Sequence, residues 1–356
     1  IVDFARTWGT NSVTLDSNGL NFQGNDDTYT VEYTTSGQSV NLVYSDSTKG
    51  WIPLEDDVVA EEPVAPAIQR GIFAFGYTGS YTNISNLVGS NGVIGSDVTG
   101  VGTARGFMAA ATYGGDKAIF GFGTTGSLTG VTNLVNSSGV VASDTSAVGT
   151  AKADLSATGY GDNLAIFAFG NTGSMSNSRN LVSSSGVVAS DATGAGTATQ
   201  RKGAARYGTG TAIIAFGENG GKTNTKNLVS NTGVIASDAT GGGTALTSHM
   251  AAQYGTGTAI FAFGQNAAGN MVGTSNLVNS SGAIASDVSA VGTARNFIAA
   301  TNYGGDKAIF AYGTPNNSSN LSTSNLVNSS GVVGSDVSGV GTARWALSAA
   351  GYSFSA

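Results

Sequence analysis

The sequence predicts an all-β protein in which a small antiparallel β-module precedes a six-bladed β-propeller of four-stranded blades. Three observations lead to this fold class: one pattern occurs six times, each copy contains four strand-like pieces, and the last strand of the chain completes the first copy. The composition agrees with it. The chain has 54 Gly and only 10% charged residues, and its Val, Ile, Thr, Phe and Tyr between Gly and Ser favour short strands and tight turns.

The repeat is defined by four landmarks in constant order: an apolar segment of the type AIFAFG, then NLV, SD and GTA. The apolar segment is spaced by 47 residues four times and by 49 residues once, and a period of 40 to 50 residues is typical of propeller blades. It starts at Gly71, Ala118, Ala165, Ala212, Ala259 and Ala308.

Each copy contains four strand-like pieces separated by turn sequences. In the second copy they are residues 107–113, 117–122, 133–135 and 140–148, here called strands a to d. Strand b is an almost continuous apolar run, as expected for a strand covered on both faces. GGD follows strand a and NSSG follows strand c, and Gly and Asn in such turns tolerate positive φ.

The two ends of the repeat region predict a ring. The first copy begins with strand b, whereas residues 345–356 form a lone strand a. We expect this last strand to pair beside Ile72–Phe75 and to leave no open sheet edge.

The order of these elements resembles the kelch repeat over residues 67–356. The Arg that the kelch family carries near the blade junction is matched by Arg105, Arg295 and Arg344, and Lys152 replaces it conservatively. Thr199 and Leu246 depart from the pattern, and the double Gly and the aromatic pair of the family are missing. Because two of the six positions are uncharged, we expect a structural inter-blade hydrogen bond for the repeated Arg, with a cationic ring for an anionic glycan as the alternative.

The first 54 residues do not share the repeat. They alternate in strand fashion, and VNLVYSDSTKGW resembles a small β-module of tail-fibre and other virion proteins of bacteriophages, especially marine ones. We expect a module at 1–54, incomplete at its N-terminus, with residues preceding Ile1. An acidic, Pro-containing linker at 55–66 then leads to the propeller at 67–356.

Several classes of function are disfavoured by the composition. The chain has no Cys, so thiolate metal sites are excluded, and its net charge of −7 argues against nucleic acid as a partner. No apolar run reaches the ~18 residues of a membrane span. The Asp of each SD fits a turn cap or calcium, but no ligand run surrounds it. We therefore expect no metal, no cofactor and no membrane insertion.

The variable positions of the repeat predict the binding face. The three residues after each GTA(R) change in every copy, and the loops between strands b and c change in length. Both lie on one face of the predicted disc, and functional residues tend to lie on loops of a rigid frame. The predicted ligand-binding residues on this face are Tyr77, Tyr81, Phe107, Asp154, Arg201, Lys202, His249, Phe297 and Trp345. Burial of the aromatic residues at the blade tops is the alternative reading.

The resulting hypothesis is a virion structural protein of a bacteriophage, in a tail fibre or another host-facing appendage of the particle. Its propeller would bind a host-surface glycan or another virion protein without catalysis, and phage fibres suggest a homotrimer by analogy. The alternatives are a head decoration or tail subunit with a packing role, and a polysaccharide depolymerase that uses Asp154 and Glu218.

Overall fold

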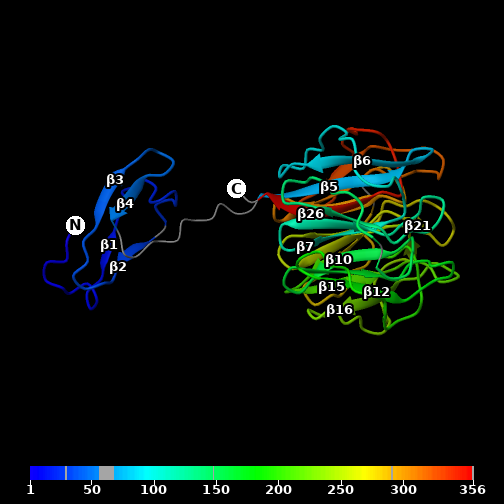
Figure 1. Ribbon diagram of the computed structural model, residues 1–356, viewed down its shortest axis with the longest axis horizontal. Helices are drawn as coiled ribbons and strands as arrows, with labels where there is room; N and C mark the ends of the chain where they lie inside the picture. The colour runs from blue at the N-terminus through cyan, green and yellow to red at the C-terminus, as the bar shows by residue number, and fades with distance from the viewer. Residues whose placement is uncertain (29, 56–67, 147, 290–291, 355–356) are drawn as a thin grey trace. The chain divides into compact units, whose positions relative to one another are not determined.

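The computed structural model describes residues 1–28, 30–55, 68–146, 148–289 and 292–354. The regular structure within these ranges consists of 26 strands without a helix, which confirms the predicted all-β class. The chain divides into two compact units, Ile1–Ala67 and Ile68–Ser355, and each is treated by itself (Figure 1). Except for Glu55, the predicted linker at 55–66 lies outside the described residues.

Unit 1 consists of two short antiparallel ribbons around a small apolar core. Strand β1 (Val13–Leu15) pairs with β2 (Val31–Tyr33), and β3 (Asn41–Tyr44) pairs with β4 (Trp51–Glu55). Trp8, Phe22, Val31, Tyr33 and Val40 are buried together between them. The segment around Phe22 forms isolated bridges rather than the strand that its alternation predicts.

Unit 2 contains six antiparallel sheets of three or four strands within its described residues, in the order that the repeat predicts. The first sheet is β26 (Ser348–Phe354), β5 (Ile68–Tyr77) and β6 (Tyr81–Val88), and the second is β7 (Ala109–Tyr113), β8 (Lys117–Gly121) and β9 (Thr132–Val135). The third is β10 (Ser156–Tyr160), β11 (Leu164–Ala168), β12 (Ser178–Val182) and β13 (Ala192–Thr193), and the fourth is β14 (Gly203–Tyr207), β15 (Thr211–Ala215), β16 (Thr225–Val229) and β17 (Ala239–Thr240). The fifth is β19 (Met250–Tyr254), β20 (Thr258–Ala262) and β22 (Ser275–Val278), the sixth is β23 (Ala299–Tyr303), β24 (Lys307–Ala311) and β25 (Ser324–Val327), and a separate ribbon joins β18 (Leu246–Thr247) to β21 (Gln265–Asn266).

The fourth piece of each repeat pairs less than its sequence predicts. In the second sheet, the chain after β9 touches it only at Val135↔Val141 and Thr132↔Thr145. Between these bridges, the side-chain amide of Asn133 donates to Ala142 O at 3.0 Å and to Asp144 Oδ1 at 2.9 Å. The buried side chain therefore occupies the place that a continuous ladder of backbone bonds would take.

The C-terminal strand pairs with the first strand of the repeat region, as predicted. Ser348 lies opposite Ala74, Ala350 opposite Ile72, and the ladder continues through seven residue pairs. In Figure 1 the red strand β26 lies between β5 and β7. The strands β7, β10, β14, β19, β23 and β26 each contact the next in this order, and β26 also contacts β7.

In each repeat, an Asp carboxylate binds the chain segment that leaves the preceding sheet. The Asp97 carboxylate accepts hydrogen bonds from the backbone N–H and the hydroxyl of Thr342, 245 residues away, and from Asn86 Nδ2 at 2.8 Å. Each of the other SD aspartates likewise accepts from the Thr in the GTA of the preceding repeat. Thr and Asn donors thus hold the pKa of Asp97 below its usual value even though burial opposes them.

A buried cation lies between neighbouring sheets. Arg344 lies 4.3 Å over the ring of Tyr312 in the sixth sheet, and it donates to Phe75 O at 2.9 Å and to Asn86 Oδ1 at 2.7 Å in the first sheet. Arg105 and Arg295 also lie over an aromatic ring of the preceding sheet and donate to a backbone oxygen of their own sheet. These contacts agree with a structural role for the repeated Arg.

The two sheets without this Arg or Lys use other side chains. In the fourth sheet, where Thr199 stands, Lys202 lies 4.6 Å from the Phe169 ring and donates to Asn227 Oδ1 at 3.0 Å. In the fifth sheet, His249 stands at the position of Lys202 and packs 5.0 Å from the Phe216 ring. The buried Asn276 Oδ1 of this sheet has no hydrogen-bond partner among the described residues, and neither has Asn133 Oδ1 of the second sheet, where Arg105 is present.

Replacing Arg344 tests the contribution of the buried cation. Arg344→Met keeps much of the stem but leaves the Phe75 and Asn86 oxygens without a donor, so we expect unit 2 to lose about 2–4 kcal/mol of stability. The measurement is urea unfolding of the full chain followed by tryptophan fluorescence. Lys117→Met, on a half-exposed side chain of the second sheet, is the control with little expected change. Equal stabilities of both variants would contradict the role of the cation.

The buried lysines predict a stability that rises with pH. Burial lowers the pKa of Lys152 to about 8, against 10.5 when exposed, and nearby Asp191 opposes the shift. Between these two values the unfolded chain binds more protons than the folded one, so stability rises with pH there. We expect Lys152→Met to reduce the gain in unfolding free energy between about pH 7.5 and 9.5 by about 1–2 kcal/mol. The same gain in both proteins would contradict the shift.

Candidate binding site

A ring of backbone hydrogen bonds joins the six residues that occupy one equivalent position after each GTA. Each amide donates to the carbonyl of the preceding member at 2.8–3.3 Å, and the last bond returns from Phe107 N to Ala346 O. The members are Phe107, Asp154, Arg201, Ser248, Phe297 and Ala346. Each has a φ between 48° and 58°, a region in which bulky residues are rare, so the ring holds strained backbone in place. We call this set the hub.

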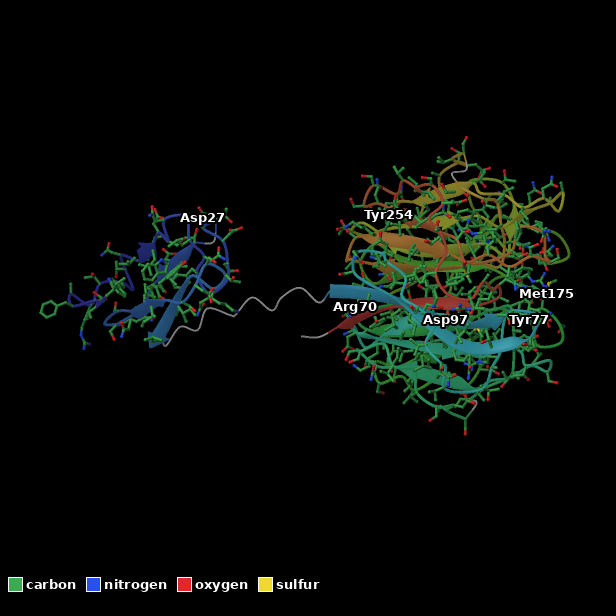
Figure 2. All side chains as sticks on the ribbon, turned by 90° about the horizontal axis from the view of Figure 1, so that it is seen from above. Asp27, Arg70, Tyr77, Asp97, Met175 and Tyr254 are labelled. Atoms are coloured by element: carbon green, nitrogen blue, oxygen red, sulfur yellow. The ribbon has the colours of Figure 1, made fainter. Side chains whose placement is uncertain are left out.

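The loops that vary between repeats lie on the same side of unit 2 as the hub. Backbone bridges join each hub connection to the start of the loop after strand b, for example Gly106↔Thr124 and Trp345↔Tyr77. In Figure 2 Tyr77 and Met175 mark this side, which we call the hub face, whereas Arg70 and Tyr254 lie toward the opposite side, the turn face. The turn face carries the GGD and NSSG turns, since Tyr352 packs against Gly139 and Tyr254 against Gly331.

Five of the predicted aromatic residues form one cluster at the hub. Trp345 is at its centre, with ring centroids 5.5 Å from Tyr77, 5.4 Å from Phe107 and 5.1 Å from Phe297. Tyr81 packs edge-on against Tyr77 at 5.3 Å. Because the hub member beside Trp345 is the small Ala346, Phe107 and Phe297 also meet directly, at 5.6 Å. All five side chains are half-buried, so this part of the hub face offers aromatic surface to solvent.

An ion network borders the aromatic cluster. Arg201 Nε lies 3.2 Å from Asp154 Oδ1, and Arg201 Nη1 donates to Glu218 Oε1 at 2.9 Å. The Arg201 guanidinium also lies 5.3 Å over the Phe297 ring. Gln200 and Lys222 donate to the two Glu218 oxygens at 2.8 Å each. Arg201 therefore connects the acidic side of the hub to its aromatic side.

The two carboxylates of this network have pKa values shifted in opposite directions. Burial raises the pKa of Asp154, as does the nearby Glu218, while the attraction of Arg201 opposes them. The donors around Glu218, led by Lys222 and Gln200, hold its pKa below the usual value although burial raises it. Such a split is typical of acid–base pairs, but here both carboxylates are engaged in ion pairs that a structural network also explains.

Lys202 and His249 lie inside the molecule rather than on the hub face. Each is 2% exposed. Lys202 donates to Asn227 between two sheets, and burial lowers its pKa to about 8. His249 Nε2 accepts a hydrogen bond from Gly203 N at 3.2 Å, and burial lowers the pKa of His249 to about 3, so the imidazole is neutral.

Beneath the hub is a small cavity of about 40 Å³. It is lined by hub members and by the residues that follow them, Ser248 included. Ser248 is 6% exposed, and its Oγ has no hydrogen-bond partner among the described residues. A cavity of this size with an unpaired hydroxyl is suited to a water molecule or to a hydroxyl of a ligand.

Seven of the nine predicted residues are therefore brought together, and two are placed in the interior. The sequence prediction did not include Gln200, Ser248 and Lys222 among the site residues, although they complete the hub and its ion network. The signal for Gln200 and Ser248 was present, since both lie in the variable triplets after GTA. Lys222 lies four residues after Glu218 in the same loop, at a position to which we assigned no role from the sequence.

No family model matches the chain, and no curated protein matches it. Within the described ranges, no cluster of three or more His, Cys, Asp or Glu side chains is arranged to hold a metal ion. The same residues include no helix of the length and hydropathy needed to cross a membrane.

Two substitutions are expected to move the pKa of Asp154 in opposite directions. Arg201→Gln removes the attraction that favours the ionised Asp154, so its pKa rises further. Glu218→Gln removes a repulsion, so the pKa falls. Carbon-detected NMR titration of the Asp154 carboxyl measures both shifts. Shifts of the same sign in the two variants would contradict the network.

Proposed function

We propose that unit 2 is a closed six-bladed β-propeller whose hub face binds a carbohydrate. Three links between the first and last repeats support closure: the ladder of β26 with β5, the bonds of Thr342 to Asp97, and the bond from Phe107 N to Ala346 O. We call β7, β10, β14, β19, β23 and β26 the inner strands, and the cyclic order of their contacts supports six blades. The kelch-like order of the repeat agrees with this architecture.

The single observation that carries the binding function is the aromatic cluster around Trp345. Aromatic faces stack on the apolar faces of sugar rings, and half-buried rings fixed by their neighbours lose little entropy when a ligand binds. Arg201, half-buried at the edge of the cluster, has guanidinium N–H groups for sugar hydroxyl or carboxylate groups. Since the hub bonds fix the backbone beneath these side chains, the surface is preorganised.

The biological setting that we propose is the virion of a bacteriophage. It depends on the likeness of residues 1–54 to phage fibre modules. In this setting unit 1 joins the particle, the hub face of unit 2 meets a host-surface glycan or another virion protein, and the chain assembles as a homo-oligomer. The protein then acts as a binding protein without catalysis.

A packing role in the capsid or tail is the second candidate, and it has its own observation. An exposed Val follows the turn after strand c in five of the repeats, so apolar side chains are spaced around unit 2. These residues are Val93, Val140, Val187, Val234 and Val332. A depolymerase remains the third reading, and engagement of Asp154 and Glu218 in ion pairs weighs against it.

The carbohydrate function is tested on Trp345. Trp345→Ala removes the centre of the aromatic cluster, and we expect binding to capsular or lipopolysaccharide glycans of susceptible bacteria to weaken by about 10-fold or more. Binding is measured on a glycan array and by surface plasmon resonance. Met175→Ala, in a loop of the same face, is the matched control with unchanged binding.

Each other outcome selects a different reading. Equal binding by wild type, Trp345→Ala and Met175→Ala would overturn the hub as the carbohydrate site. Cleavage of the polysaccharide that is lost in Asp154→Asn and Glu218→Gln would establish a depolymerase. Assembly defects after Val140→Ser and Val187→Ser, with normal glycan binding, would favour the packing role.

A further inference from the structure

A second cavity lies at the opposite end of the inner strands, on the turn face. Its volume is about 190 Å³, and residues from all six inner strands line it. It is smaller than the ~300–1,000 Å³ of sites for drug-sized ligands and equals the liquid volume of about six water molecules, at ~30 Å³ each. A single sugar unit is a ligand of this scale.

The cavity is polar because of the residues at one position of the repeat, where neighbouring sheets carry different residue types. This position immediately precedes the Tyr that ends strand a, in a sequence that otherwise changes little between repeats. It is occupied by Thr112, Gly159, Arg206, Gln253, Asn302 and Gly351. Gln69 contributes another amide from β5. The cavity wall thus combines one guanidinium with amides and a hydroxyl.

The two glycines of this set make room for their polar neighbours. A Cβ at Gly159 would lie 3.1 Å from Arg206 Cδ, and a Cβ at Gly351 would lie 2.5 Å from Asn302 Oδ1. Arg206 and Asn302 therefore lie across the positions where a side chain is missing. Both Arg206 and Asn302 line the cavity.

Arg206 retains donors for a ligand. The hydrogen bond recorded for it among the described residues runs from Nη2 to Gly161 O at 3.0 Å. A guanidinium carries five N–H donors, in a planar fork that fits a carboxylate. Burial lowers the pKa of Arg206, because the charged guanidinium loses contact with water, and Asp162 opposes this shift. An anionic ligand would stabilise the buried positive charge, so the surroundings of Arg206 favour an anion.

We propose that this cavity is a binding site for a monosaccharide acid, with Arg206 on its carboxylate and Asn302 and Gln253 on its hydroxyl groups. Amide side chains both donate and accept, as sugar hydroxyls do, whereas a bare inorganic anion would use only their donors. The site is distinct from the hub, because it uses none of the hub residues and lies on the other face of unit 2.

The test is calorimetric titration of the full chain with D-glucuronate and D-galacturonate, and with neutral D-glucose and D-galactose. We expect the acids to bind with a Kd in the millimolar range or below, and at least about 10-fold more tightly than the neutral sugars. Arg206→Met should weaken binding of the acids by about 10- to 100-fold and leave the neutral sugars unchanged. Asn302→Ala should weaken both kinds of sugar, which provides a second variant if Arg206→Met fails to fold.

Arg179→Met is the matched control. Arg179 also donates one bond to a turn carbonyl, Gly233 O at 3.0 Å, but it does not line the cavity, so acid binding should be unchanged. Trp345→Ala should also leave it unchanged, which separates this site from the hub function. Absence of binding by both acids, equal affinity for acids and neutral sugars, indifference to Arg206→Met, or equally tight binding of inorganic phosphate would each overturn the proposal.

Discussion

The buried cation between neighbouring sheets is the interaction on which the rest of unit 2 depends. Arg344 lies on the Tyr312 ring of one sheet and donates to the Phe75 carbonyl and the Asn86 side chain of the next. Phe75 and its five counterparts have φ between 61° and 64°, a strained region for a bulky residue. A charge-assisted bond to the carbonyl of such a residue stabilises the backbone turn that ends strand b. The same side chain thus contributes to the packing between two sheets and to the direction of the loop after strand b.

This rigid junction frees the residues beside it to vary. The hub members lie two residues after the position of the repeated Arg in the chain, and their backbone is fixed by the ring of hydrogen bonds whatever side chain they carry. Phe, Asp, Arg, Ser and Ala all occupy the same backbone conformation, although each differs in the intrinsic cost of positive φ. The scaffold therefore tolerates a change of surface chemistry at this end without a change of fold, as a binding face requires.

The two ends of the inner strands have different chemistry for a physical reason. At the hub face the side chains are large, and the aromatic cluster and ion network fill the space and leave only about 40 Å³. At the turn face Gly159 and Gly351 leave room, and a polar cavity of about 190 Å³ remains. The alanines of the inner strands between these ends, such as Ala110 and Ala251, allow close approach of all six strands. Small residues set the distance between the inner strands, and the variable positions determine what the hub-face end and the turn-face end can bind.

The sequence by itself determined the all-β class, the six-fold repeat and the pairing of its last strand with Ile72–Phe75, because period and alternation depend only on local spacing. It also indicated the hub triplets, since variable positions in a constant repeat are visible in one chain. Tertiary structure alone decided that Lys202 replaces the missing cation at Thr199 and that His249 is buried. It also decided that the residue before each strand-a Tyr lines a cavity, a position to which we assigned no role from the sequence. These outcomes depend on which side chains meet across sheets about 47 residues apart in sequence, and short-range pattern carries no record of such contacts.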